Sequence, residues 1–246
     1  FRGVIYFVSA FTVCTGIIVW FSVKNHTHIQ ENSNNFKSDK LLSTIRMPVV
    51  WLQAIIILCA YVGYKTTDDF SLLANDVLLF DDVESAKVGT IALWTRVIIA
   101  ILAGFLADKV SASRIIIGGF LLMFIGSIII GFSHIMISEI ETQVSLSVII
   151  IFILSLIITG VGVFAIRALY FALLEEGNIP LSLTGTVTGI ISVIGFTPDI
   201  FMGPAMGLLL DNSPGLTGHR HVFLMLAAFS ITGLIASIGF HRLKAK

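Results

Sequence analysis

Six ionisable side chains interrupt long apolar stretches of this chain, and they are the residues best suited to chemistry: Lys65, Asp68, Asp69, Arg96, Arg167 and Asp199. An ionisable group within an apolar span is costly, so each one marks a candidate functional site. Arg96, Arg167 and Lys65 can attract an anion, and the guanidinium fork suits a carboxylate or a phosphate. We therefore expect these three cations to bind an anionic solute.

The acidic members of this set suit a different role. A buried carboxylate can hold a proton at a higher pH than an exposed one, so Asp199 and Asp68 are expected to carry a coupling proton. Four aromatic residues near the charges are expected to flank the solute with apolar faces and polar tips. They are Tyr61, Tyr64, Trp94 and Tyr170.

Simpler interpretations of the same charges stay open. Lys65 can pair with Asp68 or Asp69 one helical turn away and so neutralise itself. Both aspartates can lie at the outer headgroups. Arg167 can serve as a gate or extend its head to the membrane interface.

The elements that carry these residues are long and apolar. The chain is 56% hydrophobic and 12% charged, against about 25% charged in soluble domains, so lipid must cover part of its surface. Seven apolar runs are predicted to span a membrane as helices. They cover roughly residues 3–23, 48–79, 86–107, 113–133, 145–173, 183–210 and 221–241. The second, fifth and sixth runs exceed a simple span, so we expect them to be tilted, bent or extended.

Other classes of protein find little support. The net charge of zero argues against a nucleic-acid partner. No metal-ligand spacing, phosphate-binding loop or nucleophile elbow occurs, which predicts no enzyme activity, no metal and no cofactor. The histidines are expected in loops or tails, which disfavours a histidine relay. A seven-span receptor remains a rival, although the last predicted span lacks a retinal-type lysine.

Basic residues predict the orientation. With the 24–47 loop in the cytoplasm, that side holds Lys24, Lys37, Lys40, Arg46, Lys109, Arg114, Arg242, Lys244 and Lys246, and the other side holds Arg2, Lys87 and Arg220. The C-terminus is therefore expected in the cytoplasm. Residues 37–46 are expected to form either a short interfacial helix or part of a flexible linker.

The most specific string runs from Gly104 through Asp108 and Lys109 to Arg114, in a short loop between two spans. Gly104 would allow close helix packing, and Asp108 could receive a helix N-terminus or a basic side chain. The string resembles the signature loop of the major facilitator superfamily, in the copy between helices 8 and 9. The glycine that usually follows the basic residue in that family is replaced here, so the match is partial. The resemblance implies that these four residues form a conformational-gating loop.

The same resemblance implies a numbering and a domain plan. Residues 1–23 become helix 6 of an N-terminal bundle that is otherwise absent from this sequence. Residues 24–47 become the central cytoplasmic loop, and residues 48–246 become the C-terminal six-helix bundle, helices 7 to 12. The expected fold is thus an all-α membrane protein with a 3+3 inverted repeat, preceded by one further transmembrane helix.

An internal pattern agrees with an inverted repeat. Gly104-x-Leu-x-Asp108 ends the third span and Gly207-x-Leu-x-Asp211 ends the sixth, on opposite sides of the membrane. Between residues 184 and 207, glycines at helical spacing predict close helix packing, and Pro198 and Pro204 predict bends. This stretch resembles helix 11 of anion-transporting branches, and the Glu175–Pro180 turn resembles an uncharacterised bacterial branch.

In that family, helices 7, 8, 10 and 11 line the cavity, and here these helices carry the intramembrane charges. The resemblance therefore implies a secondary active transporter of the bacterial inner membrane that works by alternating access. The expected solute is an organic anion or a sugar acid, and the expected coupling ion is H+. A neutral sugar or another solute is the alternative. The remaining expected partners are membrane lipid and the N-terminal bundle.

Overall fold

The computed structural model describes residues 2–22, 44–132 and 146–244 of the chain. These residues divide between two compact units, Phe1–Asp39 and Lys40–Lys246. The first unit contains one described helix, α1 (Arg2–Ser22), whose side chains are exposed nearly throughout. The predicted central loop at 24–47 falls mostly outside the described residues, as does most of the interfacial helix considered for 37–46.

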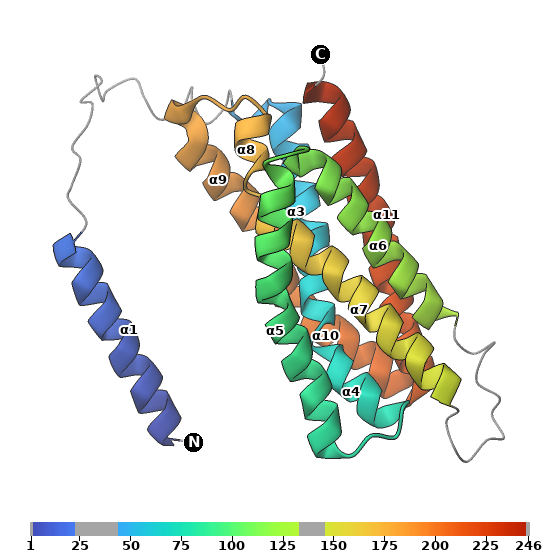
Figure 1. The fold of residues 1–246 in the computed structure, drawn as a ribbon. Coiled ribbons are helices and arrows are strands. Elements are labelled where there is room, and N and C mark those ends of the chain that lie inside the picture. The colour runs from blue at the N-terminus through green and yellow to red at the C-terminus, as the bar shows by residue number, and fades with distance from the viewer. Residues whose placement is uncertain (1, 23–43, 133–145, 245–246) are drawn as a thin grey trace. The chain divides into compact units, whose positions relative to one another are not determined.

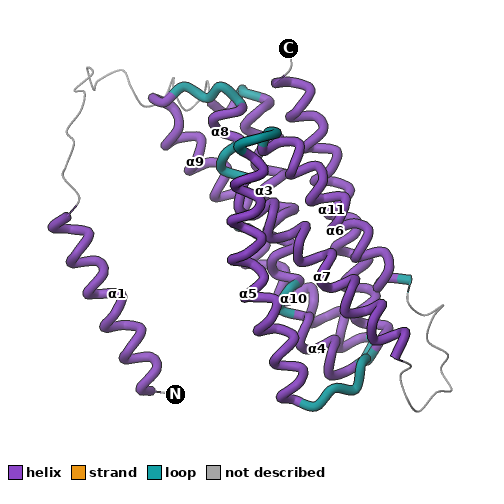
Figure 2. The backbone as a smooth tube through the Cα atoms, in the orientation of Figure 1, coloured by secondary structure: helices purple, strands orange, loops and turns teal. Residues whose placement is uncertain are grey.

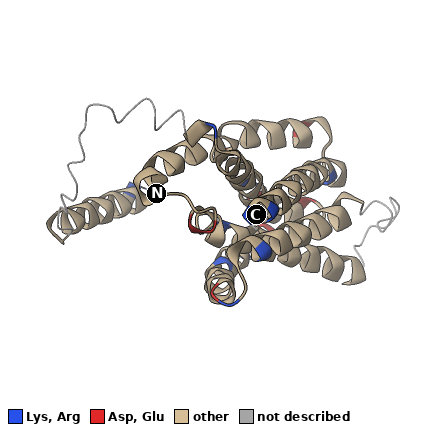
Figure 3. Cartoon of the chain, turned by 90° about the horizontal axis from the view of Figure 1, so that it is seen from above, with Lys and Arg blue, Asp and Glu red and all other residues tan. Residues whose placement is uncertain are grey.

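The second unit is a helical bundle (Figure 1). Its helices are α3 (Pro48–Thr66), α4 (Asp69–Asp76), α5 (Asp82–Ala107), α6 (Ala112–Gly131), α7 (Leu146–Leu169), α8 (Leu173–Glu176), α9 (Leu181–Gly195), α10 (Pro198–Asn212) and α11 (Leu216–Lys244). With α1 they form seven helical segments that are long and apolar enough to cross a membrane. Charged residues are sparse along the ribbons (Figure 3). The seven predicted spans and the all-α membrane class are confirmed.

Two of the long spans are broken, as their length suggested. The span that begins at Pro48 stops at Thr66 and resumes as α4, and the Thr67 hydroxyl donates to the Tyr64 carbonyl across the break at 2.7 Å. The span that begins at Leu181 breaks between α9 and α10. Pro198 occupies the first turn of α10, where a missing N–H costs least. The helix is thus interrupted just before Pro198, as predicted, whereas Pro204 lies inside α10, which continues to Asn212. A short teal stretch of the tube beside α10 marks a break in Figure 2.

Close helix packing occurs elsewhere than predicted. A Cβ added at Gly119 or Gly162 would strike the backbone of the facing helix, so α6 and α7 approach closely there. By contrast, a Cβ at Gly185 or Gly203 would meet nothing within 4 Å. The predicted packing role of the 184–207 glycines is therefore wrong within this unit, except at Gly195, where a Cβ would meet Ile57. When glycines lie on several faces of an apolar helix, the sequence does not indicate which face packs against a neighbouring helix.

Candidate functional site

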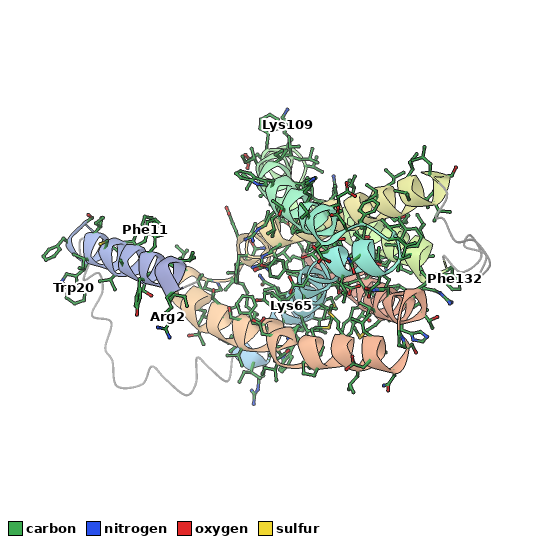
Figure 4. All side chains as sticks on the ribbon, turned by 90° about the horizontal axis from the view of Figure 1, so that it is seen from below. Arg2, Phe11, Trp20, Lys65, Lys109 and Phe132 are labelled. Carbon is green, nitrogen blue, oxygen red and sulfur yellow. The ribbon has the colours of Figure 1, made fainter. Side chains whose placement is uncertain are left out.

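Three of the predicted charges, on α3, on α10 and at the N-cap of α4, meet where α3 and α10 come together. The Lys65 ammonium lies 3.4 Å from Asp199 Oδ1 and 3.7 Å from Asp68 Oδ2. The Tyr61 hydroxyl donates to Asp199 Oδ2 at 2.9 Å. Figure 4 shows Lys65 in the middle of the bundle and Lys109 at its edge. Lys65 and Asp199 thus share a layer, and Lys65 pairs both across helices and within its own segment.

Two arginines from other helices face the ring of Tyr64. The Arg167 guanidinium of α7 lies 3.5 Å from the ring centroid, and that of Arg96 on α5 lies 5.7 Å from it. Arg167 also lies 5.2 Å from the ring centroid of Tyr61. These distances are within the range of cation–π attraction. We call Tyr61, Tyr64, Lys65, Arg96, Arg167 and Asp199 the central cluster.

Among the described residues, the lysine of the central cluster has carboxylate neighbours and the two arginines do not. Within the described part of the chain, neither Arg96 nor Arg167 forms a salt bridge, whereas Lys65 has two carboxylate neighbours. One terminal nitrogen of Arg167, Nη1, is buried and has no hydrogen-bond acceptor among the described residues. A buried donor without an acceptor is costly, and a guanidinium more so. Within the described part of the chain, no carboxylate therefore offsets the positive charge of these two arginines.

The remaining predicted site residues lie at the margin of the cluster or away from it. Tyr170 is buried, and its backbone carbonyl accepts a hydrogen bond from Gln53 Nε2 at 3.0 Å. Trp94 is 72% exposed. It precedes Arg96 by two residues, about 200° around the helix, so it faces away from Tyr64. Asp68 is mostly exposed, and its only described ion pair is with Lys65.

The predicted gating loop has fewer contacts than expected. A Cβ at Gly104 would meet nothing within 4 Å, so the expected close packing at this glycine is absent within the unit. Asp108 is the C-terminal cap residue of α5 and is exposed, as is Arg114. The Lys109 ammonium lies 4.3 Å from the ring centroid of Phe105. The helix N-terminus that Asp108 was expected to receive is bound by another carboxylate.

That carboxylate is Glu176, at the end of α8. Its Oε1 accepts from the Ala112 N–H at 2.6 Å, and its Oε2 lies 2.9 Å from the Lys244 ammonium of α11. Beside it, Ser113 Oγ lies 2.9 Å from His241 Nδ1. Burial disfavours the ionised Glu176, but hydrogen bonds with Lys244, Ser113 and Ala112 outweigh it and hold the pKa of the carboxyl below its ordinary value. We call these five residues the Glu176 network.

Sequence patterns did not predict this network or the burial of one histidine. Glu176 follows another glutamate in a short polar turn, a pattern typical of a solvated loop. His219, His221 and His241 were expected in loops or tails but lie in α11, and His219 is fully buried.

Comparison with known proteins finds two relatives that match this chain to a similar degree. The chain is 24% identical to the inner membrane protein YihN of Escherichia coli (strain K12), over 97% of the chain and 56% of that protein. It is also 24% identical to the inner membrane protein YqcE of the same organism, over 99% of the chain and 57% of that protein. The chain thus spans just over half the length of the curated relatives it matches. No family model and no solved structure matches it.

The names of these relatives and the fold both indicate a membrane protein. The chain is an all-α integral membrane protein. Its described residues include seven helical segments long and apolar enough to cross a membrane, and its relatives bear the names of inner membrane proteins. The central cluster is the place in the described bundle where charges from four spans converge.

Proposed function

We propose that the chain is part of a secondary active transporter that moves an organic anion or a sugar acid, coupled to protons, by alternating access. The observation that carries the proposal is the uncompensated pair Arg96 and Arg167 beside Tyr64. Two cations held among apolar helices without carboxylate partners need an anionic ligand to balance them. Tyr61 and Tyr64 supply flat faces on which the carbon frame of a small solute can pack.

The coupling part of the proposal rests on Asp199. Its carboxylate is shared by Lys65 and Tyr61, so its protonation would break the ion pair with Lys65 and leave that ammonium with the exposed Asp68. Proton binding at Asp199 would thereby change the charge that the solute meets. Asp68 is the second candidate for this role because it contacts the same ammonium.

We further propose an inner-membrane location with the C-terminus in the cytoplasm, in accord with the names of the relatives and the distribution of basic residues. The major facilitator fold, with the 104–114 loop as its gate, is part of the same proposal. The two breaks, at Thr67–Asp68 and Phe196–Thr197, support it because transporters commonly place ligands beside interrupted helices.

A neutral sugar is the second candidate solute. The pair of Lys65 and Asp199, with the Tyr61 hydroxyl, is a self-neutralised set of donors and acceptors that sugar hydroxyls could join. This set is directly adjacent to the arginines, so a sugar acid could use both.

The test is uptake by the full-length protein in proteoliposomes. Radiolabelled D-glucuronate, smaller carboxylates and D-glucose are compared, with and without a pH gradient. We expect an anion to accumulate only with the gradient. Arg167→Gln should remove that uptake, and the matched variant Arg242→Gln, exposed in the last turn of α11, should retain it. Binding without flux would favour a receptor, and uptake of glucose alone would favour the neutral solute.

A further inference from the structure

The short helix α4 contacts α11 through a buried histidine, beside the stacked rings of Phe70 on α4 and Phe223 on α11, whose centroids lie 6.3 Å apart. His219 Nδ1 lies 2.8 Å from Asp69 Oδ2, and Nε2 lies 3.1 Å from Asp76 Oδ2. The side chains of His219 and Asp69 are fully buried, and that of Asp76 is 35% exposed. Asp69 and Asp76 are the first and last residues of α4, about two helical turns apart, so one ring binds both ends of the helix.

The two contacts depend on the protonation of the ring. A neutral imidazole donates from one nitrogen and accepts at the other, whereas an imidazolium donates from both. An ionised carboxylate only accepts. With Asp69 and Asp76 both ionised, the imidazolium satisfies both contacts, and the neutral ring turns a lone pair towards one carboxylate.

Few other charges act on this ring. From α3, Lys65 is the nearest cation along the chain, and it is engaged by Asp68 and Asp199. From α6, the only charged residue is Arg114, at the opposite end of the helix. Asp211 of α10 and Asp82 of α5 are exposed.

The neighbours of His219 on α11 are also directed elsewhere. Arg220 donates its Nε to the Gly131 carbonyl at 3.0 Å, and His221 is exposed. Among the described residues, the ionised contacts of the ring are therefore the two α4 carboxylates.

The position of α4 matters to the central cluster. Asp68, directly before α4, pairs with Lys65, and both line a cleft of about 290 Å³ together with Asp69 and residues of α10. A displacement of α4 would move Asp68 away from Lys65. It would also change the shape of the cleft beside the proposed solute site.

We propose that Asp69, Asp76 and His219 form a proton-binding site, separate from Asp199, that holds both ends of α4 against α11 when the ring is protonated and releases one end of α4 when the ring is neutral. The ligand is a proton, which reaches the ring through the partly exposed Asp76. The proposal concerns the attachment of a helix and does not depend on which solute is carried.

The test is hydrogen–deuterium exchange of the full-length protein in lipid nanodiscs at about pH 5.5 and about pH 8.5. Rates are corrected for the intrinsic pH dependence of amide exchange, and α6 serves as the internal reference. In the wild type, the protection of α4 should fall by about tenfold or more between the two pH values, because one of its two attachments is lost. Constant protection of α4 would overturn the proposal.

Three variants distinguish a proton site from a merely structural contact. Asp76→Asn should keep α4 protected at both pH values, because the amide can donate to the neutral ring nitrogen. His219→Gln should leave α4 weakly protected at both. His221→Gln, exposed two residues further along α11, should behave as the wild type. If the protection of α4 in Asp76→Asn or in His219→Gln fell between the two pH values as much as in the wild type, the proposal would be overturned.

Discussion

The central cluster and the Glu176 network both gather charges from several helices, and they differ in how those charges are balanced. In the Glu176 network, one carboxylate meets a helix N-terminus and one ammonium, so positive and negative groups match. In the central cluster, Lys65 is matched by Asp199 and Asp68, but among the described residues Arg96 and Arg167 contact aromatic faces and no carboxylate. We therefore expect the balanced network to stabilise the fold and the unbalanced one to bind a ligand.

The difference predicts that mutations in the two regions separate binding from stability. The largest effects are expected for Arg167→Gln and Arg96→Gln, each of which removes one of the two uncompensated cations. Uptake of the anion by the full-length protein should fall by about tenfold or more, because a desolvated charge pair is worth roughly 2–5 kcal/mol. The melting temperature should not fall, since no carboxylate loses its partner. Wild-type transport rates in Arg96→Gln would remove this residue from the site.

The opposite pattern is expected for Glu176→Gln. The variant weakens the acceptor for the Ala112 N–H and leaves Lys244 unpaired, which should destabilise the protein by about 2 kcal/mol. Thermal denaturation in detergent measures this loss, and the solute concentration that half-saturates uptake should stay unchanged. Glu175→Gln, one residue earlier and exposed, is the matched control. Equal melting temperatures for the two variants would contradict the assigned role of Glu176.

The pH dependence of stability sharpens the same comparison. Because the pKa of Glu176 is held below its ordinary value of 4.5, the network contributes fully above that value and loses its contribution as the pH falls through the folded-state pKa. The melting temperature of the wild type should therefore fall more steeply in acid than that of Glu176→Gln. Parallel curves below pH 4.5 would show that the carboxylate is not responsible.

A smaller effect is expected in the part of the central cluster where positive and negative charges are balanced, as they are in the Glu176 network. Tyr61→Phe removes one hydrogen bond to Asp199, which is half-exposed and keeps Lys65. The loss of about 1 kcal/mol should change uptake only about fivefold. A complete loss of uptake would place Tyr61 in direct contact with the solute.

The smallest effect is expected at Trp94. This side chain is 72% exposed and faces away from Tyr64, so Trp94→Ala should leave uptake within about twofold of the wild type. A larger decrease in the uptake assay would restore the interpretation of Trp94 as an aromatic wall of the site.

Sequence patterns correctly predicted those features of the fold that depend on residues close together in the chain. Long apolar runs predicted the spans, and Pro198 predicted the position of the break between α9 and α10. The cost of a charge among apolar residues drew attention to Lys65, Arg96, Arg167 and Asp199, and the structure brings all four together.

The features that were missed depend on the rotation of helices about their axes and on contacts between distant segments. Helical spacing indicates that Trp94 and Arg96 point apart, but only the packed helix shows which of the two faces Tyr64. Glu176 and Ala112 are separated by 64 residues, and His219 and Asp69 by 150. No local pattern distinguishes such partners from solvated charges.

The most direct test of the central claim is ligand-induced thermal stabilisation of the purified full-length protein. D-glucuronate and D-glucose form a matched pair that differs by one carboxylate. We expect the acid to raise the melting temperature of the wild type and of Arg242→Gln and to have no effect on Arg167→Gln. Glucose should have a smaller effect throughout. Equal stabilisation of the wild type and Arg167→Gln by the acid would contradict the claim that the uncompensated arginine binds the anion.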